Sequence, residues 1–175
     1  TTTLSALHHQ LGWTHTVLKP TISAGGRHTY RLDPTTWAAH EAVFQTLIAS
    51  EDLMLQPFLE PILTKGELAI LVVGGQVTHA MHKTAQQGDF RVQEKFGGAL
   101  ALHAATLAEI DLAQRAVGAC PGDPLYARVD LVWDNDDQLV VSELEIFEHE
   151  MWFRFCPPAA GCLAETIGNY MKATV

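Results

Sequence analysis

Short runs in which apolar and polar side chains alternate recur along the chain, and this two-residue period predicts β-strands. The clearest pair is ELAILVV and QVTHAMHK, which flank the dipeptide Gly74-Gly75. Two glycines between such runs are typical of a tight β-hairpin. If that turn sets the register, Glu67 faces His82. Further strands are predicted at residues 16–20, 28–32, 53–56, 126–133 and 138–147.

Helical periodicity marks three other segments. Residues 37–50 place several apolar side chains on one face, and the preceding Thr36 is a candidate N-cap. Two more helices are predicted at about residues 104–117 and 158–172, whereas residues 84–99 follow neither period and predict a long loop. The chain has no internal repeat and no flexible linker, so we expect one compact unit, with two lobes as a variant of it.

The last predicted hairpin gathers charged residues. With a four-residue loop at residues 134–137, Trp133 lies opposite Gln138, and Arg128 lies opposite Glu143. Strand alternation then gives two faces. The first carries Arg128, Asp130, Val141, Glu143 and Glu145, and the second carries Val129, Leu131, Val140, Leu144 and Ile146. Carboxylates without neighbouring His or Cys suit Mg²⁺ or Mn²⁺, and the alternative is a solvated acidic face paired with Arg128.

The net charge sharpens this picture because it is local. The 175 residues carry a formal charge of −9, and residues 130–150 hold eight acidic side chains with no Lys or Arg. The acidic balance argues against nucleic acid or an anionic membrane as a partner.

The chain shows no apolar run of membrane-spanning length and no secretory signal pattern, and its three cysteines are expected to be free thiols of a cytoplasmic protein. The aromatic group Trp152, Phe153 and Phe155 is expected in the core or at a lobe interface.

Lys19 stands just before a glycine-bearing turn. A lysine there is a point charge that can reach a phosphate, and Gly25 and Gly26 allow a close backbone approach. An ordinary hairpin with a surface lysine explains the same residues.

The order of these features resembles the ATP-grasp superfamily, in the branch that contains glutathione synthetase, D-alanine–D-alanine ligase and the cyclo-ligase of D-cycloserine biosynthesis. The similarity spans residues 17–148, and the residues of these segments most resemble those of the cyclo-ligase type. Four segments carry it: VLKPTISAGGRHTYRL, MLQPFLEPILTKGELAILVVGGQVTHAMHK, DFRVQEKFGG and YARVDLVWDNDDQLVVSELEIFE.

The resemblance implies an α+β ATP-grasp fold, in which two α+β lobes with antiparallel sheets clamp the nucleotide. Residues 1–57 would form the lid lobe with its glycine hairpin, and residues 58–175 the metal-binding lobe. Relatives carry a preceding α/β domain that this sequence does not contain, so we expect a fragment of a longer enzyme or a partner chain that supplies the domain. The implied activity is an ATP- and Mg²⁺-dependent (or Mn²⁺-dependent) ligation of a carboxylate, activated as an acyl-phosphate, to an amine.

The resemblance also implies roles for single residues. The nucleotide would be held by Lys19 at the phosphates, by the lid Gly25 and Gly26, by the adenine-reading hinge Gln56, Pro57, Phe58 and Leu59, and by Glu67 at the ribose. Arg91 and Arg128 would bind the γ-phosphate or the acyl-phosphate, and Lys83 would add a phosphate contact unless it is a solvent-facing strand end. The metal ligands would be Asp130, Glu143 and Glu145, although many relatives have Asn in place of Glu145.

Two other classes of function stay open. A non-catalytic nucleotide-binding or regulatory module would bind ATP without turnover, and a metal-dependent phosphohydrolase would use the same carboxylates on water. The expected partners are small carboxylate and amine substrates, and a homo-oligomer is one possible state.

Overall fold

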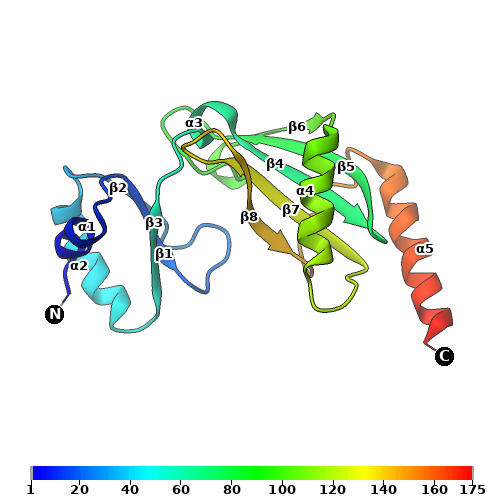
Figure 1. The fold of residues 1–175 in the computed structure, drawn as a ribbon, viewed down its shortest axis with the longest axis horizontal. Helices are drawn as coiled ribbons and strands as arrows, with labels where there is room; N and C mark the ends of the chain where they lie inside the picture. The colour runs from blue at the N-terminus through cyan, green and yellow to red at the C-terminus, as the bar shows by residue number, and fades with distance from the viewer. Residues whose placement is uncertain (1, 175) are drawn as a thin grey trace. The chain divides into compact units, whose positions relative to one another are not determined.

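The computed structural model describes residues 2–174 and divides the chain into two units, one ending at Leu59 and the other beginning at Glu60. The first unit contains a three-stranded antiparallel sheet in the order β2-β1-β3 (Figure 1). Its elements are α1 (Leu4–Leu11), β1 (Thr16–Pro20), β2 (Tyr30–Leu32), α2 (Trp37–Ile48) and β3 (Leu53–Pro57). The core of this unit joins both helices to the sheet through Leu4, Leu18, Leu32 and Phe44.

The second unit is built on a five-stranded antiparallel sheet in the order β6-β5-β4-β7-β8. Its elements are α3 (Ile62–Lys65), β4 (Glu67–Val73), β5 (Gln76–Thr84), the 3-10 helix η1 (Glu94–Phe96), β6 (Ala99–His103), α4 (Leu107–Gly118), β7 (Tyr126–Trp133), β8 (Leu139–Glu145) and α5 (Pro157–Ala173). The predicted α+β class with antiparallel sheets is therefore confirmed.

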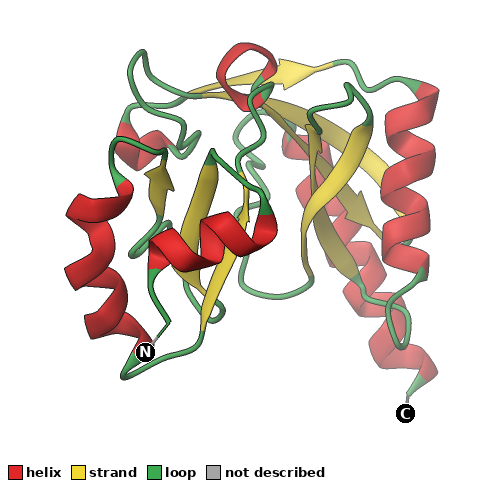
Figure 2. Ribbon diagram, turned by 60° about the vertical axis from the view of Figure 1, so that its left-hand side comes forward, coloured by secondary structure: helices red, strands yellow, loops and turns green. Residues whose placement is uncertain are grey.

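The two faces of this sheet have different cover. Helix α4 lies across one face (Figures 1 and 2) and packs through Ala113 and Val117 on side chains such as Ile70 and Val129. The opposite face is covered at one end by residues 151–155 and by Leu163 of α5. The rest of that face carries the charged residues described below.

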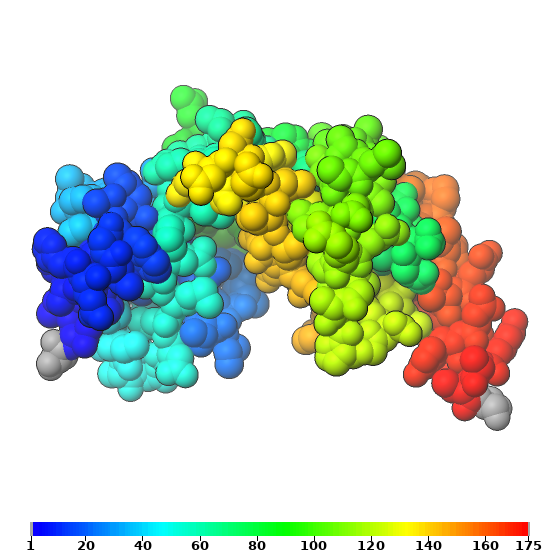
Figure 3. Space-filling view, viewed as in Figure 1, coloured from blue at the N-terminus to red at the C-terminus, as the bar shows by residue number. Residues whose placement is uncertain are grey.

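Helix α5 continues well beyond this packing. Ala159 is its one buried residue, and residues 169–174 are exposed. Figure 3 shows this C-terminal half, in red, standing clear of the rest of the second unit. No helix among residues 2–174 combines the length and apolar character needed to cross a membrane.

Several predicted boundaries were wrong. The strand expected at residues 28–32 is confined to Tyr30–Leu32, and Thr36 makes no side-chain cap for α2 because its hydroxyl instead accepts the Asp33 N–H. The loop expected at residues 84–99 contains η1 and the start of β6. Helices α1 and α3 were not predicted.

Both predicted registers were also wrong: a bulge shifts the first hairpin, and the second differs both at its turn and at a bulge. In the first hairpin the pairing shifts between Leu71 and Val72, so Glu67 lies opposite Lys83 rather than His82. In the second, Trp133 already lies opposite Leu139 rather than Gln138 next to the turn, and the pairing shifts by one more residue between Asp130 and Leu131, so that Arg128 lies opposite Glu145. An extra residue in one strand reverses which side chains share a face beyond it. Between the turn and the bulge of the second hairpin, Val141 pairs with Leu131 and Val140 with Val132, the reverse of the predicted facing, and beyond the bulge the predicted facing returns.

Candidate functional site

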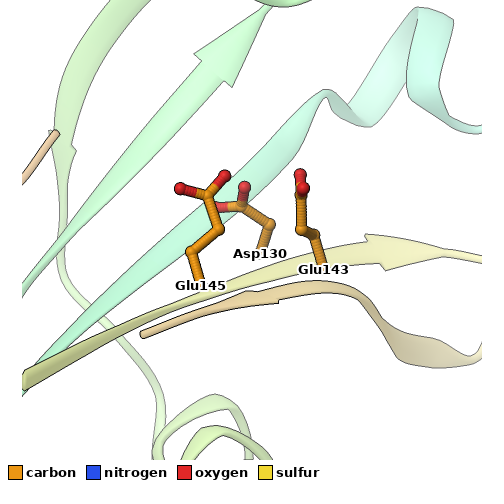
Figure 4. A group of neighbouring side chains, drawn as sticks. All are labelled: Asp130, Glu143 and Glu145. Carbon is orange, nitrogen blue, oxygen red and sulfur yellow. The ribbon is translucent and has the colours of Figure 1, made fainter. Parts of the chain in front are cut away.

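Three carboxylates meet on the sheet face opposite α4. Asp130 of β7 lies directly opposite Glu143 of β8, and Glu145 lies two residues farther along β8. One oxygen from each carboxylate falls within 4.8 Å of the others, and Figure 4 shows the three side chains rising to the same side of their strands. Asp130 is buried, Glu145 is half-buried and Glu143 is exposed. The predicted convergence of these residues is confirmed as geometry.

Arg128 ties two of these carboxylates together. Its Nε donates to both oxygens of Asp130, at 3.0 and 3.2 Å, and its Nη2 donates to Oδ2 of Asp130 at 2.9 Å. The same Nη2 donates to Glu145, which lies opposite Arg128 in the ladder. This two-pronged contact matches the planar fork of a guanidinium.

Lys83 connects the carboxylates to the neighbouring strands. Its side chain is 8% exposed, and its Nζ lies 3.1 Å from Oδ2 of Asp130 while pairing with Glu67. The alternative of a solvent-facing strand end was therefore wrong. Both contacts follow from the ladder, because Glu67 lies opposite Lys83 and Ala69, on the same face, lies opposite Asp130.

The cluster has more negative than positive groups. Glu67, Asp130, Glu143 and Glu145 face two cations, Lys83 and Arg128. Burial raises the pKa of Glu67 to about 7, with the charge of Lys83 opposing this effect. Burial also raises the pKa of Glu145 against the pull of Arg128. A fully ionised cluster would carry a net charge of −2, and this charge favours the binding of one divalent cation.

The donor set tests which cation would fit. All three converging groups are carboxylates, and no His or Cys belongs to the group found among residues 2–174. Hard oxygen donors suit Mg²⁺ or Mn²⁺ rather than Zn²⁺. The residues therefore fit the metal that the resemblance implies.

An aromatic ring adjoins both cations. The centroid of the Trp152 ring lies 5.3 Å from Cζ of Arg128 and 5.7 Å from Nζ of Lys83. Trp152 is 6% exposed and belongs to the core that was predicted for it. Sequence reasoning missed its contact with the cations, since nothing in the local pattern of residues 151–155 points to Lys83.

The nucleotide candidates of the first unit lie on or next to its central strand. Lys19 is half-buried on β1, opposite Met54, and makes no ion pair or hydrogen bond through its side chain among the described residues. Gly25 and Gly26 form a turn with φ of 58° and 72°, a region that favours glycine. Arg27, which follows them, forms an ion pair with Glu51 at 2.6 Å.

The expected hinge residues lie at the end of the same sheet. Gln56 and Pro57 close β3, opposite Val17 and Thr16. Phe58 is buried, and its N–H donates to the carbonyl of His15. The guanidinium of Arg31 stacks on the Phe58 ring at 4.0 Å, and Leu59 follows at the boundary between the units.

Arg91 stands apart from the carboxylate cluster. Its guanidinium pairs with Asp89 at 2.7 Å and stacks on Phe96 at 3.7 Å. Hydrogen bonds from Arg91 lower the pKa of Asp89 to about 2. No contact among the described residues joins Arg91 to Asp130, Glu143 or Glu145.

Comparison with known proteins identifies the family. The family model of the prokaryotic glutathione synthetase ATP-grasp domain matches residues 2–120. The chain therefore belongs to this ATP-grasp family, as the sequence resemblance indicated. No curated protein matches the chain in sequence.

Solved structures share the fold. D-cycloserine synthetase DcsG superposes with a TM-score of 0.79 at 22% identity, covering 95% of this chain and 59% of that one. The ATP-grasp ligase PsnB, solved with a phosphomimetic variant of its minimal precursor, Mg and ADP, has a TM-score of 0.63 at 20% identity over 93% and 49%. The D-alanine–D-alanine ligase from Bacillus anthracis gives 0.63 at 15% identity over 97% and 57%.

The ATP-grasp fold is thus confirmed for this chain. The chain spans between 49% and 59% of the length of these three solved proteins.

Proposed function

We propose that this chain is the nucleotide- and metal-binding part of an ATP-dependent ligase that joins a carboxylate to an amine through an acyl-phosphate. The observation that carries the proposal is the cluster in which Asp130, Glu143 and Glu145 converge beside Arg128 and Lys83. Membership of the ATP-grasp family supports the same activity. The substrates would be small carboxylates and amines.

The three carboxylates would hold Mg²⁺ or Mn²⁺. When bound there, the metal would neutralise charge on the transferring phosphoryl oxygens. PsnB has been solved with Mg and ADP, which supports the same pairing here. Arg128 and Lys83 would supply positive charge to the phosphates or to the acyl-phosphate. Both cations pair with Asp130, one of the three metal-ligand candidates, and are therefore held next to the metal site.

The remaining nucleotide contacts are assigned by the resemblance. Lys19 would bind the phosphates beneath a lid formed by Gly25 and Gly26, and Gln56, Pro57, Phe58 and Leu59 would read the adenine. Glu67 would accept hydrogen bonds from the ribose hydroxyls. Its carboxylate would then bind the ribose and Lys83 at the same time. Arg91 would serve as a further phosphate contact, which requires it to exchange Asp89 for the nucleotide.

The rest of the enzyme would lie outside this chain. The solved proteins with the same fold are longer, so a preceding α/β domain would complete the acceptor pocket and select the carboxylate and the amine. The two lobes, residues 1–57 and 58–175, would close on the nucleotide. We place the protein in the cytoplasm, and size-exclusion chromatography would test the proposal that it forms a homo-oligomer.

The proposal is tested by metal-dependent nucleotide binding. We expect ATP with Mg²⁺ to raise the thermal midpoint of the chain, and we expect EDTA to remove that rise. Glu143→Gln should abolish the metal-dependent part at little cost in stability, because Glu143 is exposed and pairs with no cation among the described residues. Glu165→Gln, an exposed change on α5, is the matched control.

An unchanged metal dependence in Glu143→Gln would contradict the assignment of the cluster. A second test uses the longer protein that contains this chain. If the proposal is right, this protein releases ADP only when both a carboxylate and an amine are present. Phosphate release from ATP without an acceptor would favour a phosphohydrolase instead, and binding without any turnover would favour a regulatory module.

A further inference from the structure

Among residues 2–174, Trp152 is the only aromatic residue whose ring lies next to both cationic side chains of the carboxylate cluster, Arg128 and Lys83. Arg128 lies 5.3 Å and Lys83 5.7 Å from the ring centroid. Both distances are within the range in which the negative face of an indole attracts a cation. The two cations come from different strands, β7 and β5, and Trp152 comes from neither.

The backbone at Trp152 is unusual for so large a residue. Its φ is 46°, and Glu148, four residues earlier, has a φ of 56°. A bulky side chain in this left-handed region is strained and persists only where its surroundings hold it. Here the Trp152 N–H donates to Oε1 of Glu150 at 2.9 Å, and the ring packs with Ala69, Leu71 and Met81. The strained turn keeps the ring on the sheet face that carries the charges.

Packing alone does not require an aromatic ring at this position. The other buried members of its cluster are all non-aromatic: Ala69, Leu71, Val73, Met81 and Met151. What an aliphatic residue lacks is the quadrupole that faces Arg128 and Lys83. The ring also attracts a cation without cancelling its charge, which a carboxylate partner does.

We propose that Trp152 is a positioning residue that holds Arg128 and Lys83 in place for the phosphates of the nucleotide. The proposal rests on the proposed function. In the structure both cations contact the ring of Trp152 as well as Asp130. A metal ion on the Asp130 oxygens would weaken the hold of Asp130 on both cations. Lys83 would keep Glu67 and the ring, Arg128 would keep Glu145 and the ring, and the ring would be the one partner that they still share.

The test compares nucleotides that differ in phosphate number. Calorimetry would measure the affinities for ATP and ADP with Mg²⁺, and for AMP, in wild type, Trp152→Leu and Trp152→Phe. We expect Trp152→Leu to weaken ATP binding roughly three- to thirtyfold and ADP binding less, with AMP binding within about twofold of wild type. Trp152→Phe keeps an aromatic face and should recover most of the ATP affinity.

A second tryptophan provides the matched control. Trp133 also has a cation over its ring, Nζ of Lys65 at 5.2 Å, but that pair belongs to a contact with the exposed Asp137. Trp133→Leu therefore removes the same kind of interaction from the same sheet and should leave the ratio of ATP to AMP affinity unchanged.

The outcomes separate the proposals. Equal losses for all three nucleotides, or none, would overturn the positioning role, because a packing defect does not depend on phosphate number. If Trp152→Leu does not fold, the flexible Trp152→Met takes its place with the same expected ratios. A wild-type chain that binds no ATP would instead overturn the proposed function.

Discussion

Glu67 and Lys83 stand opposite each other on adjacent antiparallel strands, and the Lys83 ammonium that pairs with Glu67 also lies 3.1 Å from Asp130. One buried cation thus connects carboxylates from β4 and β7. The arrangement leaves Glu67 short of positive charge, because Arg128 is committed to Asp130 and Glu145. This explains why burial outweighs the attraction of Lys83 and raises the pKa of Glu67.

The raised pKa predicts a pH-dependent stability in the absence of metal. In the unfolded chain Glu67 titrates near 4.5, and in the folded chain near 7, so folding takes up a proton between these values. The resulting stabilisation is fully present below pH 4.5 and is lost as the pH rises through 7, by at most roughly 3 kcal/mol. Urea unfolding at pH 5, 6, 7 and 8 in EDTA should show wild type losing stability relative to Glu67→Gln across this range.

Glu165→Gln is the control for this experiment. Glu165 is an exposed residue of α5, so its substitution should leave the pH profile of wild type unchanged. Parallel profiles for wild type and Glu67→Gln would show that Glu67 keeps an ordinary pKa in the folded protein.

The charged face was predictable from the sequence, but its pairing was not. Strand alternation alone placed Arg128, Asp130, Glu143 and Glu145 on one side, and they lie there. The bulges after Leu71 and Asp130 and the longer turn after Trp133 left no mark in the alternating pattern, so the predicted partners were wrong. One shift gives Glu67 the cation Lys83 in place of His82, which changes the electrostatics of the whole cluster.

Two missed elements show different causes. The capping signals of α1 were in the sequence: Thr3 accepts the Ala6 N–H, and Gly12 adopts a φ of 69° just beyond the helix. For β6 there was no such signal, since ALALH contains residues that favour helices. Its strand conformation comes from pairing with β5, a contact between distant parts of the chain. The ring contact of Trp152 with Lys83 was hidden for the same reason.

Lys19→Ala should weaken ATP binding without weakening the fold. The Lys19 side chain makes no ion pair among the described residues, so its removal leaves no buried partner behind. Loss of a charge-assisted phosphate contact should reduce affinity by about 1.5–3 kcal/mol in calorimetry. Lys172→Ala, at the exposed end of α5, removes the same charge and should have no effect. An affinity equal to that of wild type would exclude Lys19 from the phosphate site.

Gly66→Ala should damage both stability and nucleotide binding, because Gly66 fixes the chain immediately before Glu67. Its φ of 68° and ψ of −154° are open almost only to glycine, and an added Cβ would lie 2.2 Å from the carbonyl oxygen of Lys83. Gly75 has a similar φ of 76° with nothing within 4 Å of its added Cβ, so Gly75→Ala reports the cost of a positive φ without a clash.

Urea unfolding should therefore give a loss of about 1 kcal/mol for Gly75→Ala and about 3 kcal/mol or more for Gly66→Ala. The difference between the two variants combines the close approach of Gly66 to Lys83 with the added backbone cost of its ψ of −154°. Because that clash displaces the strand end that carries Lys83, Gly66→Ala should also lower the affinity for ATP with Mg²⁺, whereas Gly75→Ala should not. Equal losses of stability, or an ATP affinity that is unchanged in Gly66→Ala, would show that the site does not depend on this contact.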